Sequence, residues 1–558
     1  MSSTPTLSAL NPDTETYPLL TEAQVERIWP FAQVRSVQRG DVLYQPGDLA
    51  VPLFVLLSTG VEIVQLDADG ERPITVLCPG MFTGEAGMIG GQRSVVLARV
   101  TQPGEVLEVC PDNLRSLAAQ DAQISEVLLR AFILRRLMLI TRQLGNVLII
   151  GSRHSANTVR LREFLGRNGH PYTYIDLDKD SSSQALLDRF DVGVDEIPIV
   201  ICNGKRVLRS PSTLELADHL GLNDNMEGSL LRDLIIVGAG PAGLAAAVYA
   251  ASEGLDPLLV ESHAPGGQAG SSSRIENYLG FPTGVSGQEL ASSATTQAQK
   301  FGAKIAVARA ITELRCHRRP YELVMEDGSV LFARTIVIAT GACYKKPDVA
   351  QLDSFEGRGI HYGATYIEAQ LCMDEEIVVI GGGNSAGQAA VFLSQTARKV
   401  HMLVRSSDLS NTMSRYLIQR ILANPGIELL CETELIGLSG SGSLEEVTWI
   451  NRKTQETSFV RARHVFVMAG ARPNTEWLRD CVALDENGFI LTGRDLPLIP
   501  DGISPAWPLK RAPQMLESSL PGVFAVGDVR AGSIKRVASA VGEGAISISL
   551  IHRALAEL

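Results

Sequence analysis

The chain has 558 residues, of which 45% are hydrophobic and 20% charged, and its formal net charge is −12 at pH 7. This length predicts about three or four domains, and the acidic excess argues against nucleic acid or an anionic membrane as the main partner. No apolar run is long enough to span a membrane. The N-terminus lacks a basic start followed by an apolar core, so we predict no signal peptide and a cytoplasmic location.

Short alternating strands between glycine turns dominate residues 18–142, as in GDVLYQPGD and LFVLLSTGVEIVQLDADG, and an amphipathic helix is predicted over 124–144. The segment GEAGMIGGQRS at 84–94 resembles the phosphate cassette of cyclic-nucleotide-binding domains of the catabolite-activator type. That resemblance implies a β-roll with a long C-terminal helix. No helix-turn-helix pattern follows the roll, which disfavours a DNA-binding regulator.

The resemblance gives roles to four residues of this cassette. Glu85 would accept a hydrogen bond from the ribose 2′-hydroxyl, and Arg93 would pair with the cyclic phosphate. Ser94 would donate a further bond, with help from backbone N–H groups near Gly84. The alternative is a roll that binds nothing and packs on the rest of the chain, so a cyclic nucleotide is one of two readings.

Residues 145–222 alternate strands and helices, in the order NVLII, TVRLREFLGRNG, YTYIDL, SQALLDRF, IPIVI and LELADHLG. This order resembles the glutaredoxin/thioredoxin fold, and Ile197-Pro198 falls where that fold keeps a cis-proline. The C-P-Y-C of that family aligns with Ser155, Ala156, Asn157 and Thr158, so this thioredoxin-like α/β module lacks the thiol pair. We interpret it as a docking or spacer domain, followed by a linker at 223–229.

The first dinucleotide fingerprint is LIIVGAGPAGLAAAVYAASEGLDPLLVE. An apolar strand leads into Gly238, which allows a tight turn, and Gly240, which lets the backbone approach a pyrophosphate. Gly243 lets the following helix pack on the strand, and the phosphates would face the N–H groups at the start of that helix. Glu261 ends the second strand, where an acid accepts hydrogen bonds from a ribose.

The second fingerprint is EEIVVIGGGNSAGQAAVFLSQTARKVHMLVR, in which Gly381, Gly383 and Ala386 repeat the arrangement. No acid ends its second strand, and Arg405 stands there instead. Because an arginine can neutralise a 2′-phosphate, this favours NADPH over NADH. A solvated surface charge is the alternative interpretation of Arg405.

Residues 231–558 resemble the thioredoxin reductase family of flavoproteins. Beside the fingerprints they contain GGQAGSSSRIENYLGFPTGVSGQEL, TIVIATGA at 335–342, GVFAVGDVR at 522–530 and KRVASAVGEGA at 535–545. The resemblance implies two nested Rossmann-like dinucleotide-binding domains, for FAD at 231–345 and 480–558 and for NAD(P)H at 346–479. It also implies a homodimer. NADPH is the expected reductant, and NADH stays open.

Positions of this sequence that match the family's cofactor motifs form two sets. Those for FAD are Gly238, Gly240, Pro241, Ala242, Gly243, Glu261, Gly267, Gln268, Asn277, Ala339, Thr340, Gly341, Gly527, Asp528, Arg536, Val537 and Ala538. Those for NAD(P)H are Gly381, Gly383, Asn384, Ser385, Ala386 and Arg405. In the family, the acid in GVFAVGDVR bonds the ribityl chain, and the residues after it lie near the flavin ring.

The sequence departs from the family where a C-A-T-C pair attacks disulfides. The aligned stretch at 362–366 is YGATY, with Gly363 and Tyr366 at the cysteine positions. None of the eight cysteines forms a C-x-x-C, and we predict that most are small buried hydrophobes, Cys372 included. Tyr366 would be part of a packed segment that shields the flavin ring.

We therefore predict a multidomain α/β oxidoreductase with an N-terminal β-roll, a thioredoxin-like module and two nested Rossmann-like domains. It would pass electrons from NAD(P)H through FAD to a small-molecule or protein acceptor that is not a protein thiol, under possible control by a cyclic nucleotide. The alternative is a slow-turnover redox or cyclic-nucleotide sensor that acts through a protein partner. The sequence assigns no catalytic side chain and no metal site.

Overall fold

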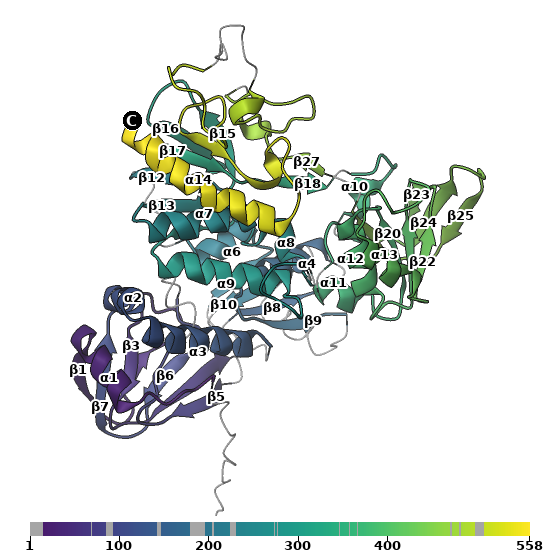
Figure 1. Cartoon of the computed structure of the whole chain (residues 1–558). Coiled ribbons are helices and arrows are strands. Elements are labelled where there is room, and N and C mark those ends of the chain that lie inside the picture. Colours follow the sequence, from purple (N-terminus) through teal and green to yellow (C-terminus); the bar gives the residue numbers. More distant parts are fainter. Residues whose placement is uncertain are drawn as a thin grey trace, which may run out of the picture.

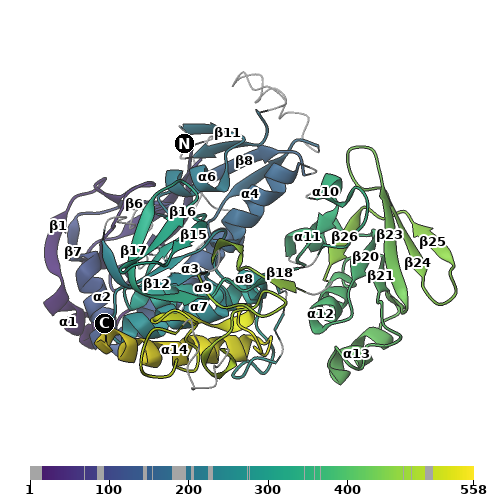
Figure 2. The ribbon, with the colours of Figure 1, turned by 90° about the horizontal axis from the view of Figure 1, so that it is seen from above.

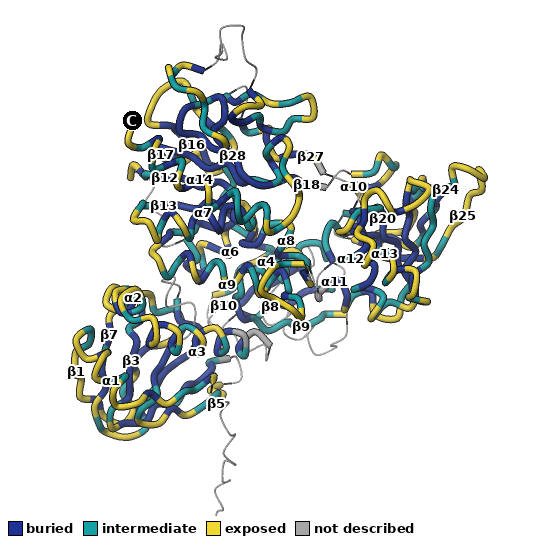
Figure 3. Tube along the Cα trace, in the orientation of Figure 1, coloured by how far each residue is buried: buried dark blue, intermediate teal, exposed yellow. Residues whose placement is uncertain are grey.

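The computed structural model describes residues 15–67, 70–84, 93–141, 147–153, 155–178, 196–202, 206–223, 230–272, 274–275, 277–344, 346–356, 358–364, 366–468, 471–478, 481–496 and 507–557. The chain is a multidomain α/β protein, as predicted, in which several sheets are arranged side by side (Figure 1). Buried residues concentrate inside each group of strands, so each unit has its own core (Figure 3).

The N-terminal unit is a β-roll of two antiparallel sheets, with strand orders β1-β7-β3 and β2-β6-β4-β5. The predicted long helix is confirmed as α3, and its buried residues Ile124, Leu128 and Phe132 share one core with β3 and β7. The elements are α1 (Glu22–Ile28), β1 (Gln33–Val37), β2 (Val42–Tyr44), β3 (Leu53–Leu56), β4 (Val61–Asp67), β5 (Gly70–Leu77), β6 (Leu97–Val100), β7 (Gly104–Val109), α2 (Pro111–Gln120) and α3 (Ala122–Thr141).

The middle unit, which comprises the described residues between Val147 and Asn223, is built on a four-stranded sheet with the order β11-β10-β8-β9. Strands β8 and β9 are parallel, whereas β10 runs antiparallel to β8 and to β11. The expected cis peptide before Pro198 is present. The expected helix over SQALLDRF lies outside the described residues. The elements are β8 (Val147–Gly151), α4 (Ala156–Arg167), β9 (Thr173–Asp176), β10 (Ile199–Cys202), β11 (Arg206–Arg209) and α6 (Thr213–His219).

The first fingerprint lies in a seven-stranded sheet, which we call the larger sheet. Its strand order is β14-β13-β12-β17-β16-β15, and β28 pairs with β17. Residues of α7, α9 and α14 share an apolar core with one face of its parallel strands β12, β13 and β17. The elements are β12 (Leu231–Val237), α7 (Pro241–Ser252), β13 (Pro257–Val260), α8 (Gly267–Gly270), α9 (Gly287–Lys300), β14 (Lys304–Ala306), β15 (Ile311–Arg315), β16 (Tyr321–Met325), β17 (Val330–Ile338), β28 (Val523–Ala525), η6 (Gly527–Val529) and α14 (Val537–Glu557).

The second fingerprint lies in a parallel sheet with the order β19-β26-β20-β21-β22, beside an antiparallel sheet β23-β24-β25. We call the described residues of 346–468 the nucleotide-side unit. Seen from above, this unit stands apart from the larger sheet (Figure 2). The elements are β18 (Ala342–Tyr344), α10 (Leu352–Phe355), β19 (Ile360–His361), α11 (Tyr366–Leu371), β20 (Glu376–Ile380), α12 (Asn384–Leu393), β21 (Lys399–Leu403), α13 (Arg415–Leu422), β22 (Ile427–Leu430), β23 (Thr433–Ser439), β24 (Glu446–Asn451), β25 (Thr457–Val460), β26 (His464–Val467), β27 (Ala471–Pro473) and η4 (Glu476–Leu478).

The middle unit is fastened to the larger sheet by polar and apolar contacts. Val307 and Ala308 belong to the core of the middle unit. Asn223, the first residue of the expected linker, exchanges two hydrogen bonds with the backbone of Val307, at 2.9 and 3.1 Å. Arg309 forms an ion pair with Asp218 at 3.0 Å. The described chain of the middle unit therefore extends to Asn223, and residues 224–229 of the predicted linker lie outside the described residues.

The prediction that most cysteines are buried free thiols is wrong in part. Cys316 and Cys481 form a disulfide across 165 residues, and Cys78 and Cys110 are exposed. Cys372 is buried, as predicted. Helices within the described residues are too short or too polar to cross a membrane.

Candidate functional site

The glycines of the first fingerprint form a close-packed turn between β12 and α7. Gly238 has φ +102°, and a Cβ there would lie 3.0 Å from Thr340 Cα, with the Ala339 carbonyl closer still. A Cβ on Gly243 would enter the backbone of Gly238. In contrast, a Cβ on Gly240 would meet only Gly267 Cα, at 4.0 Å, so this position borders open space. The turn thus has room for a ligand at the start of α7, where Pro241 and Ala242 follow.

Glu261 and the loop at 264–268 border the same turn. The Glu261 carboxylate is buried and accepts hydrogen bonds from the backbone N–H groups of Ala239, at 2.7 Å, and His263, at 2.9 Å. A Cβ on Gly267 would lie 2.9 Å from Gly240 Cα, and Gln268 donates to the carbonyl oxygen of Ala342. Asn277, in contrast, is exposed on a turn.

The segment TIVIATGA at 335–342 is tied to the chain that returns from the nucleotide-side unit. Thr340 donates to the carbonyl oxygen of Asn474, and the Asn474 amide donates to the carbonyl oxygen of Thr340, both at 2.9 Å. The backbone N–H of Asn474 also donates to Gly341, which has φ +62°. This pairing extends the two-stranded sheet of β18 and β27 that joins the units.

The segment GVFAVGDVR at 522–530 brings the C-terminal helix α14 to the same turn. A Cβ on Gly527 would lie 3.0 Å from Ala242 Cβ, and the Gly527 N–H donates to Glu543 at 2.7 Å. Asp528 is half-buried; burial raises the pKa of its carboxyl, Lys535 lowers it and Glu543 raises it. Three predicted residues lie at the start of α14: Arg536, Val537 and Ala538.

Most of the predicted flavin residues therefore converge on one turn. Gly238 approaches Ala339, Gly240 approaches Gly267, and Gly527 approaches Ala242, whereas Asn277 is exposed. The lack of side chains at these glycines, with free helix N–H groups beyond Gly240, fits the pyrophosphate of a dinucleotide.

The second fingerprint repeats this turn with a more open surface. Gly381 has φ +138°, and its added Cβ would lie 3.1 Å from the buried Ala386, with the Met468 backbone closer still. A Cβ on Gly383 would meet nothing within 4 Å. Asn384 accepts a hydrogen bond from the N–H of Ser414 at 2.8 Å. Ser385 is exposed at the start of α12. The space beside Gly383 can therefore admit a second dinucleotide.

Arg405 is exposed beyond the end of β21, next to the second fingerprint. Within the described part of the chain, its guanidinium makes no hydrogen bond or ion pair. The neighbouring Ser406 hydroxyl donates to the carbonyl oxygen of Asp408 at 2.6 Å. Arg405 is thus available to an anionic group at the edge where a ribose lies in such sheets.

The YGATY segment at 362–366 packs against residues 271 and 272. We call residues 264–272, which border the first fingerprint turn, the flavin-side loop. Gly363 faces Ser271, whose Cβ would lie 3.3 Å from a Cβ added at Gly363, and Ala364 forms a parallel bridge with Ser272. Tyr362 donates to Glu356 at 2.6 Å. Thr365 and the Tyr366 side chain lie outside the described residues, so the shielding role of Tyr366 stays a prediction.

The predicted cyclic-nucleotide cassette is described at its two ends. Arg93 donates to the carbonyl oxygen of Gly47 at 3.1 Å, and the Ser94 hydroxyl donates to Val96 at 2.8 Å. Gly84 has φ +111°. Glu85 lies outside the described residues. A phosphate bound here would require Ser94 to change its hydrogen-bond partner.

Arg135 of α3 is buried beside this cassette. Its guanidinium donates to the carbonyl oxygens of Gly84, at 2.9 Å, and Phe82, at 3.0 Å, and it stacks over the Phe82 ring. Burial lowers the pKa of Arg135 to about 10, so the group stays charged at neutral pH. A buried cation held by carbonyl dipoles and an aromatic ring fixes α3 to the cassette.

Two further arginines continue from α3 to the flavin-side loop. Arg136 donates to the carbonyl oxygen of Gly169 at 2.6 Å, just beyond α4. Arg167, in the last turn of α4, donates to the carbonyl oxygen of Gly267 at 2.9 Å. Gln288 of α9 donates to the Arg167 carbonyl at 2.9 Å. A hydrogen-bonded connection therefore runs from the cassette, through the middle unit, to the glycine loop of the first dinucleotide site.

Sequence reasoning missed Arg135, Arg136, Arg167 and Asn474. None lies in a recognisable motif, and each acts on a backbone carbonyl far away in the sequence. The described residues hold no group of three or more His, Cys, Asp or Glu side chains that could bind a metal ion.

Comparisons with known proteins agree with this geometry. Residues 232–544 match the family model of the pyridine nucleotide-disulphide oxidoreductases, and residues 34–121 match that of the cyclic nucleotide-binding domain. A thioredoxin reductase of Chlamydia trachomatis is 33% identical over 321 residues, which are 56% of this chain and 95% of that protein. A thioredoxin reductase of Mycoplasmopsis pulmonis is 31% identical over 323 residues, 58% of this chain and 97% of that protein.

The structure of Lactococcus lactis thioredoxin reductase superposes with a TM-score of 0.52 at 28% identity, over 59% of this chain and 100% of that chain. The fold, with its two fingerprint turns, is that of an oxidoreductase. The chain belongs to the pyridine nucleotide-disulphide oxidoreductase family. It is of thioredoxin reductase type and carries a cyclic-nucleotide-binding domain.

Proposed function

We propose that this chain is an FAD-dependent NAD(P)H oxidoreductase that delivers electrons to an acceptor other than a protein disulfide. The observation that carries the proposal is the packing of Gly363 and Ala364 on Ser271 and Ser272. This segment lies beside the flavin-side loop at the place where relatives of this type carry thiols. A glycine and a tyrosine cannot exchange disulfides, so the electrons need another exit.

The residues around the first fingerprint would hold FAD. The N–H groups at the start of α7 would bind the pyrophosphate, Glu261 would orient the ribose, and Asp528 would bond the ribityl chain. When bound, FAD supplies the two-electron chemistry. The protein contributes position: the Thr340–Asn474 pair fixes the loop against the returning chain, so the two dinucleotide sites keep a defined connection.

The second fingerprint would hold NADPH, with NADH as a weaker reductant. Gly383 leaves open space for a pyrophosphate, and Arg405 would neutralise the 2′-phosphate. The family resemblance also supports a homodimer, which the molar mass in solution, measured by light scattering, would test.

The middle unit is proposed to be a glutaredoxin-like module that has lost its redox role and serves as a docking element. Its strand order supports the fold. Ser155 stands at a cysteine position and caps α4, where its hydroxyl accepts from the Thr158 N–H. Arg167 and Gln288 then link this helix to the flavin-side loop and α9.

A cyclic nucleotide is proposed to regulate the oxidoreductase through the arginines of α3 and α4. Arg135 contacts Gly84 in the cassette, Arg136 contacts Gly169, and Arg167 contacts Gly267. A phosphate bound to the cassette would change the conformation of the segment at Gly84. Because the Gly84 carbonyl accepts a hydrogen bond from Arg135 of α3, this change would shift α3. The same connection would carry flavin occupancy back to the cassette, because coupling between two binding sites is reciprocal.

The decisive experiment is anaerobic reduction of the purified holoprotein by one equivalent of NADPH, followed by addition of one acceptor at a time. We expect reoxidation by a quinone or by oxygen, and none by oxidised thioredoxin. Rapid reoxidation by thioredoxin would overturn the proposal. If the flavin stays oxidised after NADPH is added, the slow-turnover sensor becomes the better description, and the same cuvette with a cyclic nucleotide would test it.

A further inference from the structure

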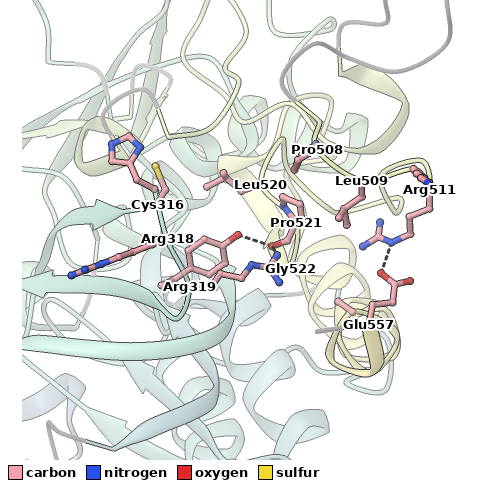
Figure 4. Close-up of a pocket in the computed structure, with 14 residues that line it drawn as sticks. Cys316, Arg318, Arg319, Pro508, Leu509, Arg511, Leu520, Pro521, Gly522 and Glu557 are labelled. Atoms are coloured by element: carbon pink, nitrogen blue, oxygen red, sulfur yellow. Dashed lines mark hydrogen bonds and ion pairs between the residues drawn. The ribbon is translucent and has the colours of Figure 1, made fainter.

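A cavity of about 700 Å³ lies away from both dinucleotide turns (Figure 4). Its walls come from the turn between β15 and β16, from residues 508–511, from residues 520–522 and from the end of α14. Gly522 immediately precedes β28, and the other end of β28 leads to Gly527 in the segment GVFAVGDVR. Five residues of extended chain span about 16 Å, so the cavity and the first dinucleotide turn are separate sites.

The cavity is strongly cationic. Four permanent cations and His317 line it against one carboxylate, that of Glu557. Two of the cations are already paired, because Arg511 binds Glu517 and Glu557 and Arg318 binds Glu322. Figure 4 shows Arg318 extending away from Pro521 and Gly522. The net charge offered to a ligand therefore comes mainly from Arg319 and Lys510.

Arg319 is held in place at the cavity wall. Its guanidinium donates to the carbonyl oxygen of Pro521 at 2.7 Å and lies over the ring of Tyr321, whose hydroxyl donates to the same carbonyl at 2.7 Å. Lys510 is exposed on the segment that follows Trp507. Cations around a concave surface attract anions and raise their local concentration.

A disulfide opens onto this cationic space. Cys316 is a lining residue of the cavity, and its sulfur is drawn at one end of it in Figure 4. Its partner Cys481 is absent from the described lining residues, and both cysteines are half-buried and pack against the apolar core of the larger sheet. From within the cavity, an incoming group therefore meets the Cys316 side of the disulfide.

We propose that this cavity binds small anionic thiols and that they exchange with the Cys316–Cys481 disulfide. The ligand class is a low-molecular-weight thiol that carries carboxylates, which Arg319 and Lys510 would bind while its sulfur approaches Cys316. The site goes beyond the proposed oxidoreductase function, because it needs neither dinucleotide.

The exchange is balanced by the thiol itself. A thiolate attacks Cys316 Sγ, a bond forms between the two sulfurs, the Cys316–Cys481 bond breaks, and Cys481 leaves as a thiolate that takes up a proton. A second thiolate attacks the mixed disulfide, releases the small-molecule disulfide, and leaves Cys316 reduced. Two thiols are thus oxidised while one protein disulfide is reduced.

The surroundings of Cys481 suit a leaving group. Its sulfur lies 3.2 Å from the carbonyl oxygen of Leu314, which can accept the S–H after the bond breaks. Cys316 follows β15 and Cys481 follows η4, so the bond connects the larger sheet with the chain returning from the nucleotide-side unit. The thiol state of the cell would thus be read at the junction of the two dinucleotide units.

The test compares three thiols of different charge on the folded full-length holoprotein. Free cysteines, such as the exposed Cys78 and Cys110, are first blocked. Glutathione (anionic), 2-mercaptoethanol (neutral) and cysteamine (cationic) are then added at equal thiolate concentration. Newly released thiols are trapped with an isotopically heavy alkylating reagent and mapped by mass spectrometry. We expect glutathione to open the disulfide about tenfold faster than cysteamine, with the mixed disulfide on Cys316.

The double variant Arg319→Gln/Lys510→Gln should bring the three rates within about twofold of one another. Arg461→Gln, which changes an exposed arginine of the nucleotide-side unit, is the matched control and should keep the advantage of glutathione. Equal rates for the three thiols in the unmodified chain, a mixed disulfide on Cys481, or no release from the folded chain would each overturn the proposal. A glutathione advantage that survives the double variant would also overturn it.

Discussion

The two fingerprint turns share one sequence pattern but differ in how much of the surrounding chain encloses them. The first glycine of each turn is tightly packed, Gly238 against Ala339 and Gly381 against Met468, so the difference lies beyond it. In the first turn Gly240 lies opposite Gly267, and the Glu261 carboxylate is held by two backbone N–H groups. In the second, a Cβ on Gly383 would meet no protein atom within 4 Å, and Arg405 is solvent-exposed. An enclosed turn suits a cofactor that stays bound, whereas an open one suits a reductant that must leave after each turnover.

The sharpest test of this comparison adds a methyl group at the packed first glycine of the flavin turn and at the open second glycine of the other turn. Gly238→Ala forces a side chain onto φ +102° and into the Ala339 carbonyl. Strain of about 1–3 kcal/mol corresponds to roughly a five- to 150-fold loss of affinity. We expect the purified variant to contain little flavin, which the ratio of flavin to protein absorbance would measure.

Gly383→Ala is the contrasting change. Gly383 is the second glycine of its fingerprint, equivalent to Gly240, and its Cβ would meet no protein atom within 4 Å. We expect normal flavin content and an unchanged melting temperature, with a raised KM for the nicotinamide dinucleotide. Equal flavin loss in both variants would mean that flavin binding does not depend on the packing of Gly238 against Ala339.

Arg405→Gln sharpens the comparison at the second turn. The guanidinium is expected to form a charge-assisted pair with the 2′-phosphate, worth about 1.5–3 kcal/mol. The KM for NADPH should therefore rise about tenfold or more, while that for NADH stays within about twofold. Arg398→Gln, at the opposite end of β21, is the control and should change neither constant. A parallel rise for NADPH and NADH would assign Arg405 a structural role.

The fingerprints could be predicted from sequence because their chemistry is local: a glycine turn, a strand before it and a helix after it lie within one short segment. The arginines could not. Arg167 acts on the carbonyl of Gly267, one hundred residues away, and any surface arginine has the same local pattern. The Cys316–Cys481 bond was missed for the same reason, since its partners are 165 residues apart and eight cysteines without close spacing fix no pairing.

The arginine contacts that connect the cassette with the flavin-side loop predict how strongly a cyclic nucleotide affects NADPH oxidation. Arg136→Gln removes the contact with Gly169, and Arg167→Gln removes the contact with Gly267. Either change should reduce the effect of a saturating cyclic nucleotide on NADPH oxidation by about fivefold, since typical coupling energies are about 1–3 kcal/mol. Stopped-flow flavin reduction, with and without cyclic AMP or cyclic GMP, would measure it.

Arg160→Gln is the control on the same helix, because Arg160 donates to Pro211 inside the middle unit. It should leave the coupling intact. Binding of a cyclic nucleotide with no effect on flavin reduction in the unmodified chain would remove the regulatory role, and the N-terminal unit would then be a scaffold.

The smallest expected effect compares two buried histidines in different units. Burial lowers the pKa of His170, in the middle unit, to about 3, and that of His361, on the nucleotide side, to about 4. Both values lie below the unfolded value of about 6.5. Each neutral imidazole therefore contributes stability that is fully present above pH 6.5 and is lost as the pH falls toward its folded pKa.

At pH 5 this loss amounts to about 2 kcal/mol for each histidine, because the unfolded chain is protonated there and the folded one is not. His170→Asn or His361→Asn should lower stability at pH 7.5 but flatten its decline between pH 7.5 and 5, as denaturant midpoints at several pH values would show. Unaltered slopes in both buried variants would mean that these imidazoles titrate alike in the folded and unfolded chain, and that acid acts on the units through their carboxylates instead.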